Sequence, residues 1–136
     1  GIDRSKIRLE MTETTMLRDY DAIHHNMEIL RKHGVGFYLD DFGTGYSNID
    51  RIINCNFDVV KFDKSLLYKA MDDESTGGLV SFLAHAFKEK GIVTLMEGVE
   101  DDAQVDFCRA NEFGYIQGYK YARPIPIEDT RSYFLK

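Results

Sequence analysis

The sequence is poor in the features that mark disulfide-rich, disordered and membrane-spanning chains. Its two cysteines, Cys55 and Cys108, lie far apart and outside any CxxC pair, so neither a disulfide framework nor a zinc site is expected. Only two prolines occur, and 43% of the residues are hydrophobic, which excludes disorder and low complexity. The longest nearly apolar stretch, residues 78–87, is about half as long as a bilayer requires. These absences predict a folded chain in a reducing, cytoplasmic setting.

An excess of positive charge is also lacking. The chain has 17 Lys and Arg residues against 23 Asp and Glu residues, which gives a net charge of −6. Because sequence-independent binding of nucleic acid needs clustered Lys and Arg side chains, DNA is not expected as a partner. An acidic chain still accommodates a phosphate substrate when metal ions lie between the carboxylates and the phosphate. The length allows one domain at most, and the first residue, Gly1 rather than Met, is expected of a processed chain or of a piece excised from a longer protein.

Strand-like and helix-like segments alternate along the chain. The apolar patterns predict strands over residues 6–11, 36–39, 57–62, 92–96 and 115–117. They predict helices over residues 19–33, 48–54, 64–90, 101–111 and 127–135, with an interruption near Gly77 and Gly78. Residues 41–47 are polar and glycine-rich, which is typical of a loop. The alternation indicates an α/β fold with parallel strands and crossover connections.

Polar functional side chains stand at the C-terminal tips of all five predicted strands: Glu10, Asp40 with Asp41, Lys61, Glu97 and Gln117. In an α/β barrel this rim of the sheet carries the chemistry. One charged residue at such a point is usually only leaving the core, but five tips together favour a site. Clustered carboxylates repel one another unless a divalent cation neutralises them, and oxygen ligands favour Mg²⁺ or Mn²⁺.

Asp40 and Asp41 are consecutive in the sequence, which restricts how both side chains can reach one site. Neighbouring residues of a regular strand point to opposite faces, so both reach one site only if Asp41 already belongs to the loop. In that arrangement Asp40 bridges two ions and Asp41 holds one of them, as in two-metal attack on phosphorus. Lys61 would then stabilise the phosphoryl charge or position the water. These residues predict a two-metal site for phosphoryl chemistry.

Other phosphate-handling classes fit less well. The triplet Asp41-Phe42-Gly43 also occurs in protein kinases, but the chain has no HRD-like catalytic loop and too few residues for two lobes. Walker and GxGxxG motifs are absent as well. The four histidines fall on predicted helices, where surface or helix-end positions are expected.

Five segments in order resemble the C-terminal part of EAL domains, the bacterial phosphodiesterases specific for cyclic di-GMP. Residues 9–14 (LEMTET) are similar to the family's ELTES strand end, and residues 39–47 (LDDFGTGYS) to its DDFGTGYS loop. Residues 60–63 (VKFD) are similar to the KID segment, and residues 97–100 (EGVE) to the segment of the same letters. Residues 116–124, which contain IQGY and ARP, resemble the QGY…RP ending. The matches span nearly the whole chain.

The resemblance implies how the strand tips divide the chemistry. Glu10 and Asp40 would bind the first metal ion, with Asp40 shared and Asp41 on the second ion. Lys61 would contact the water or the phosphate, and Glu97 would act near the ions or on the attacking water. The implied reaction is the Mg²⁺- or Mn²⁺-dependent hydrolysis of cyclic di-GMP to linear pGpG in second-messenger signalling.

The resemblance also implies supporting roles. Gln117 would lie beside the catalytic residues, and Asp63 and Glu100 would support them. Glu13 would anchor the loop of residues 41–47, which in the family links the active site to a dimer interface.

The family pattern is incomplete in this chain. The Glu-Ala-Leu motif of an early strand and the metal-binding Asn of the next functional strand are absent, and five strands cannot close a barrel. The expected fold is therefore a partial TIM-type barrel made of about the last five β/α units. Because open strand edges associate, self-association into a homodimer or higher oligomer would complete or rearrange it.

The missing motifs leave two readings of the activity. The parent domain is expected to be a phosphodiesterase, with an upstream GGDEF or sensory domain possible and any membrane anchor elsewhere in the parent, while this chain alone is expected to be inactive. The alternative is a degenerate EAL module that binds cyclic di-GMP or mediates dimerisation without catalysis.

Overall fold

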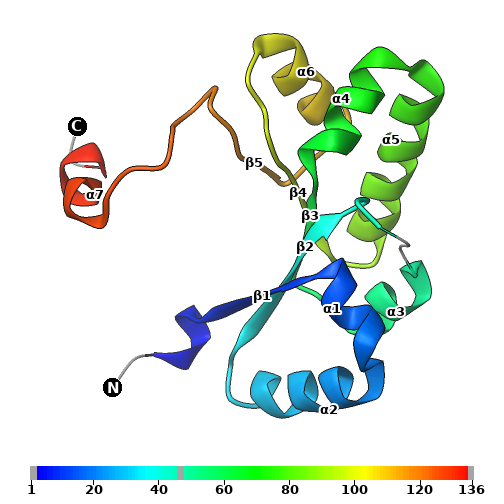
Figure 1. Ribbon diagram of the computed structural model, residues 1–136, viewed down its shortest axis with the longest axis vertical. Helices are drawn as coiled ribbons and strands as arrows, with labels where there is room; N and C mark the ends of the chain where they lie inside the picture. Colours follow the sequence, from blue (N-terminus) through cyan, green and yellow to red (C-terminus); the bar gives the residue numbers. More distant parts are fainter. Residues whose placement is uncertain (1–2, 46–47, 135–136) are drawn as a thin grey trace.

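Five parallel strands form one sheet in the middle of the molecule (Figure 1). The computed structural model describes residues 3–45 and 48–134. The strands lie side by side in chain order, and every pairing is parallel. They are β1 (Arg8–Thr12), β2 (Gly36–Phe42), β3 (Val59–Phe62), β4 (Val93–Met96) and β5 (Tyr115–Ile116). The sheet does not close, so β1 and β5 are its edges, and the predicted α/β fold with an open, partial barrel is confirmed.

Helices α1 to α6 lie on one side of the sheet, and α7 lies apart at the end of an extended segment (Figure 1). After a 3₁₀ turn, η1 (Arg4–Lys6), the helices are α1 (Glu13–Arg18), α2 (Tyr20–Arg31), α3 (Ile49–Asn54), α4 (Lys64–Asp72), α5 (Glu74–Glu89), α6 (Asp102–Ala110) and α7 (Ile127–Phe134). Side-chain caps start several of them; at α6, Asp101 accepts a hydrogen bond from the Gln104 N–H at 2.8 Å. The first and last residues of most predicted strands and helices lie within two or three residues of the observed ones.

The break between α4 and α5 falls at Asp73, whereas the sequence predicted it near Gly77 and Gly78. The backbone of Asp73 is extended (φ −135°, ψ 118°), and its side chain accepts a hydrogen bond from the Thr76 N–H at 2.7 Å. This cap satisfies an otherwise free amide at the start of α5. Both glycines lie inside α5. The prediction was wrong because the cap decides where the helix starts, while glycine only weakens a helix interior.

The core lies between the sheet and the helix layer. Along β2, Phe37 and Leu39 are buried, and the alternation of a strand places Tyr38 and Asp40 on the opposite face. Four phenylalanine rings on the helix side pack edge to face, with centroids 4.9 to 6.0 Å apart: Phe42, Phe62, Phe87 and Phe113. This aromatic cluster fixes β2, β3 and α5 relative to one another directly beneath the strand tips.

The other face of the sheet carries no helix layer in the described part of the chain (Figure 1). At one edge, Tyr115 of β5 is 55% exposed, and at the other edge Leu9 of β1 is also exposed. Unpaired backbone groups accompany these side chains along both edges. The uncovered face is the side that a closed barrel would enclose, and it is the side toward which the strand-tip carboxylates point.

Gly118 holds the chain close to Val99 just beyond β5, which allows a stability prediction. A Cβ atom on Gly118 would overlap the backbone N and O atoms of Val99, two groups already hydrogen-bonded to neighbouring backbone. We expect Gly118→Ala to lower the free energy of unfolding by about 2–3 kcal/mol, measured by urea denaturation. The matched change Gly78→Ala, whose Cβ meets no atom, should raise it by about 0.5–1 kcal/mol. Equal effects of both changes would contradict the predicted clash.

Candidate active site

A bulge in β2 brings two consecutive carboxylates to one side of the sheet. Between Leu39 and Phe42 the pairing with β3 shifts, so that Asp40 and Asp41 together stand opposite the single residue Lys61. Asp41 adopts a positive φ of 57°, an uncommon conformation for a residue other than glycine. The expectation that Asp41 belongs to the loop was wrong, because β2 continues to Phe42. The bulge, rather than the end of the strand, turns both carboxylates the same way.

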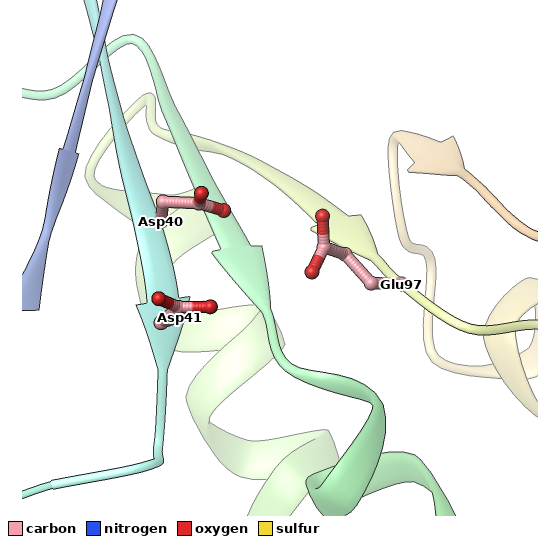
Figure 2. Close-up of side chains that lie close together, drawn as sticks. All are labelled: Asp40, Asp41 and Glu97. Carbon is pink, nitrogen blue, oxygen red and sulfur yellow. The ribbon is translucent and has the colours of Figure 1, made fainter. Parts of the chain in front are cut away.

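Three carboxylates converge at this rim of the sheet. Asp40, Asp41 and Glu97 each offer an oxygen, and these oxygens all lie within 4.8 Å of one another. Figure 2 shows Asp40 and Asp41 pointing from β2 toward Glu97, which follows the end of β4. The Glu97 N–H donates to the carbonyl oxygen of Phe62 at 3.0 Å and so fixes the backbone at that point. Three clustered carboxylate donors fit a hard divalent cation such as Mg²⁺ or Mn²⁺.

Lys61 lies at the centre of the carboxylates. It is only 7% exposed, and its Nζ lies 2.7 Å from Asp40 Oδ1 and 2.9 Å from Glu97 Oε1. A third carboxylate, Glu10 Oε2, lies 3.6 Å from the same nitrogen. One buried ammonium thus offsets part of the charge of the carboxylates that surround it.

Two opposing effects act on the pKa of Lys61. Burial disfavours the charged form and lowers the pKa, but the hydrogen bonds to Asp40 and Glu97, with the negative charge of both groups, outweigh burial and raise it above its ordinary value. Lys61 therefore stays protonated throughout the neutral range. It is suited to stabilise negative charge and cannot serve as a general base at neutral pH.

Glu10 occupies a more peripheral position than the other predicted metal ligands. It lies on the edge strand β1, its side chain is half-exposed, and its contact with the cluster is the ion pair to Lys61. Among the described residues the converging carboxylates are Asp40, Asp41 and Glu97, without Glu10. Its role as a metal ligand stays a prediction.

A pocket of about 350 Å³ opens beside Glu97 and contains the remaining predicted residues on this side. Asp63, Glu100 and Gln117 all line it. Asp63 also caps α4, where its Oδ1 accepts a hydrogen bond from the Ser65 N–H at 2.8 Å. The pocket adjoins the carboxylate cluster because Glu97 belongs to both.

Sequence reasoning assigned no role to three further residues around this pocket. Tyr119 and Pro124 line it, and the guanidinium carbon of Arg123 lies 4.2 Å from the centre of the Tyr119 ring. A flat ring backed by a cation is a surface on which a planar group can stack. The signal was present in the sequence, since all three belong to the QGY…RP segment, but the spacing alone did not place them in a pocket.

Glu13 lies apart from the cluster and beneath the turn that follows β2. It is buried, and its Oε2 accepts a hydrogen bond from the Gly43 N–H at 3.2 Å. This contact is compatible with the predicted loop anchor. The last residues of the predicted loop, 46 and 47, lie outside the described residues.

The family follows from comparison with known proteins. The model of the EAL domain family matches residues 1–124. The chain therefore belongs to the EAL domain family, and the match covers the carboxylate cluster, Lys61 and the pocket beside Glu97.

Relatives in this family carry names that describe cyclic di-GMP chemistry. The bifunctional diguanylate cyclase/cyclic di-GMP phosphodiesterase MucR of Pseudomonas aeruginosa is 32% identical over 128 residues, which are 94% of this chain and 19% of MucR. A solved PaMucR phosphodiesterase in complex with cyclic di-GMP is similar with a TM-score of 0.87 and 32% identity, over 95% of this chain and 52% of that one. Klebsiella pneumoniae BlrP1, solved as a manganese and cyclic di-GMP complex, is similar with a TM-score of 0.84 and 25% identity, over 91% of this chain and 32% of that one.

The chain spans only part of these relatives, about half of the solved PaMucR chain and a fifth of MucR. Within the described ranges, no helix has the length and apolar character needed to cross a membrane.

Proposed function

We propose that this chain supplies the carboxylate and lysine groups for metal-dependent hydrolysis of cyclic di-GMP to linear pGpG by a larger EAL domain. The observation that carries the proposal is the convergence of Asp40, Asp41 and Glu97, two of which, Asp40 and Glu97, pair with the buried ammonium of Lys61. A relative of similar fold, PaMucR, is a phosphodiesterase solved with cyclic di-GMP. This combination favours a phosphodiester substrate over other anions.

Each group has a physical task in this proposal. Asp40, Asp41 and Glu97 would hold Mg²⁺ or Mn²⁺, which when bound supplies Lewis acidity beside the phosphodiester. Lys61, fixed by two ion pairs, places a positive charge where the phosphoryl oxygens gain negative charge. Gln117 lines the adjoining pocket and offers an amide to the substrate.

The 136 residues alone are proposed to be inactive. The sheet is open at β1, and Glu10 on this edge stays outside the group of converging carboxylates. Because the Glu10 carboxylate contacts this site only through its ion pair with Lys61, the metal site of the isolated chain lacks ligands. The parent domain would supply the remaining ligands and close the sheet.

Partners follow from the same considerations. Cyclic di-GMP is the proposed substrate, and the open edges at β1 and β5 support self-association as a dimer or higher oligomer when the chain is isolated. The bifunctional name of MucR supports a diguanylate cyclase domain upstream in the parent. A cytoplasmic setting is proposed because the substrate is an intracellular messenger.

A transplant tests the function directly. The matched half of the PaMucR phosphodiesterase chain is replaced by this sequence, and conversion of cyclic di-GMP to pGpG is followed by chromatography with and without Mn²⁺. We expect Mn²⁺-dependent product from the transplant and none from the isolated chain. Product from the isolated chain would contradict the proposed incompleteness.

The transplanted domain also distinguishes the enzymatic proposal from the alternative of a degenerate module that only binds cyclic di-GMP. A folded transplant that binds cyclic di-GMP in calorimetry and releases no pGpG would overturn the enzymatic proposal in favour of the degenerate module. For the isolated chain, a bound cation present at about 100 times its dissociation constant should add about 2.7 kcal/mol of stability. If the cation stabilises an Asp40→Asn chain equally, the assigned carboxylates do not bind it.

A further inference from the structure

The pocket beside Glu97 has two walls that come from different parts of the chain. The first wall belongs to residues 97–100, between β4 and α6, and the second wall belongs to residues 117–124, beyond β5. The two walls meet at Val99, whose carbonyl oxygen accepts a hydrogen bond from the Lys120 N–H at 3.0 Å. The width of the pocket therefore depends on how firmly the second wall is held against the first.

The first turn of α6 fixes the first wall from inside the fold. The Glu100 N–H donates a hydrogen bond to Gln104 Oε1 at 2.7 Å, and Gln104 is only 8% exposed. The N–H of Gln104 in turn donates to the cap residue Asp101 at 2.8 Å. A buried side chain that belongs to the helix thus holds the backbone of this wall, so the first wall has a fixed position relative to α6.

The second wall has no such buried support in the described part of the chain. Residues 119–121 form a turn, and residues 122–126 belong to the extended segment that leads to α7 (Figure 1). An ion pair connects this wall to α6, because Lys120 Nζ lies 2.8 Å from Oδ1 of Asp102, the first residue of that helix. The Lys120 side chain is 34% exposed and that of Asp102 is 85% exposed, so the lysine is mostly covered while the carboxylate faces solvent.

The ring of Tyr119 depends on this connection. Tyr119 precedes Lys120 in the chain, and its ring lies 4.2 Å from the guanidinium carbon of Arg123. Both members of that contact belong to the second wall, so their contact moves with the wall and gives it no fixed position relative to α6. The ion pair of Lys120 and Asp102 gives it one, together with the backbone hydrogen bond to Val99.

We infer that the ion pair of Lys120 and Asp102 holds Tyr119 in place for substrate binding, which makes Lys120 a positioning residue. The inference rests on the proposed function, because the face of Tyr119 is offered to a planar base of cyclic di-GMP. Neither Lys120 nor Asp102 is among the described residues that line the pocket. Both therefore act through the position of Tyr119 and not by contact with the substrate.

The ion pair is expected to affect binding and not the chemical step. Lys61 is held by Asp40 and Glu97, and the Glu97 N–H is bonded to the carbonyl oxygen of Phe62. None of these contacts involves residues 117–124. Breaking the ion pair should therefore raise the KM for cyclic di-GMP and leave kcat unchanged. Because exposed ion pairs contribute little, the rise should be about threefold to fivefold.

Kinetics of the transplanted domain test this assignment. Lys120→Met removes the ammonium and keeps the stem, and Asp102→Asn removes the charge and keeps the volume. Each should raise KM by about threefold to fivefold, and the double variant should be no worse than either single variant, because the two residues act as a pair. Lys120→Arg keeps the charge and should restore KM. The matched control Glu112→Gln breaks another exposed ion pair, Lys88–Glu112 at 3.0 Å, and should change neither constant.

Ionic strength gives a readout that a packing role would not move. Salt screens exposed charges, so the KM of Lys120→Met divided by that of the unchanged domain should fall toward one as NaCl rises from about 0.05 M to about 1 M. The ratio cancels the general effect of salt on an anionic substrate. A loss of kcat at unchanged KM, effects that add in the double variant, or a ratio independent of salt would overturn the inference.

Amide exchange in the isolated chain separates this inference from the proposed function. The Lys120 N–H is released when the second wall opens, so its exchange with deuterium should be about fivefold faster in Asp102→Asn and unchanged in Glu112→Gln. Equal exchange in Asp102→Asn and the unchanged chain would overturn the inference whether or not the transplant is active. Faster exchange beside an inactive transplant would overturn the proposed function alone. If that transplant still binds cyclic di-GMP, the dissociation constant from calorimetry replaces KM and should show the same rise.

Discussion

Replacing Asp40 with Asn in an EAL domain that carries this segment lowers the rate of cyclic di-GMP hydrolysis by roughly 10²–10³-fold and leaves the domain folded. Asp40 pairs with Lys61 at 2.7 Å and converges with Asp41 and Glu97. Asparagine keeps the volume and one acceptor oxygen, so Lys61 retains a hydrogen bond. It removes the negative charge that a divalent cation requires.

The measurement is the rate of pGpG formation by the transplanted domain, with a thermal melt of each variant. Asp21→Asn serves as the control, because Asp21 is an exposed carboxylate of α2 remote from the rim. It should hydrolyse at the rate of the unchanged domain. Turnover by Asp40→Asn within a few fold of the control would remove Asp40 from the catalytic groups.

The arrangement of the rim follows from the sequence because parallel strands impose it. Lys61 and Glu97 come at or just after the ends of consecutive strands, and the carboxyl ends of parallel strands meet at one edge of the sheet. The meeting of the strand ends at this edge therefore accounts for the contact of these two side chains at 2.9 Å. The proximity of Lys61 and Glu97 could therefore be predicted from their positions at the strand ends, without knowledge of side-chain packing.

The bulge at Asp41 was not predictable in the same way. Strand periodicity placed Asp40 and Asp41 on opposite faces, so the sequence predicted that both could reach one site only if Asp41 belonged to a loop. The structure instead uses a register shift against β3, which depends on the pairing of two strands and on a positive φ at Asp41. Pairing register is a tertiary property, and a single strand's pattern does not contain it.

The pocket beside Glu97 shows a second kind of limit. Tyr119 and Arg123 come after the last strand, where the chain has no periodic pattern to indicate a direction. They follow Gly118, which lies so close to the Val99 backbone that a side chain would not fit there. Close approach between distant segments sets this geometry, and the sequence marks it only by a glycine.

Lys61 is expected to make a large contribution to the stability of the folded chain. Replacing it with Met, which has a similar length and no charge, should lower the free energy of unfolding at pH 7 by about 3 kcal/mol, measured by urea denaturation. The loss arises because Asp40 and Glu97 would face each other without the ammonium that now pairs with both. Lys69→Met, an exposed change on α4, should cost less than about 0.5 kcal/mol.

The effect of Lys61 has a defined dependence on pH. A lysine whose pKa is raised on folding contributes its stabilisation fully below the pKa of the unfolded chain and loses it only as pH rises through the folded pKa. The unchanged chain should therefore keep this contribution from pH 5 to pH 9.

A divalent cation and the Lys61 ammonium act on the same carboxylates, which gives the variant a further signature. Without Lys61, added Mn²⁺ is the remaining positive charge among Asp40, Asp41 and Glu97, so it should raise the melting temperature of Lys61→Met more than that of the unchanged chain. Simple loss of packing predicts an equal rise in both. A rise confined to the unchanged chain would mean that Lys61 organises the metal site, whereas the larger rise in the variant means that lysine and cation compensate for the same clustered negative charge.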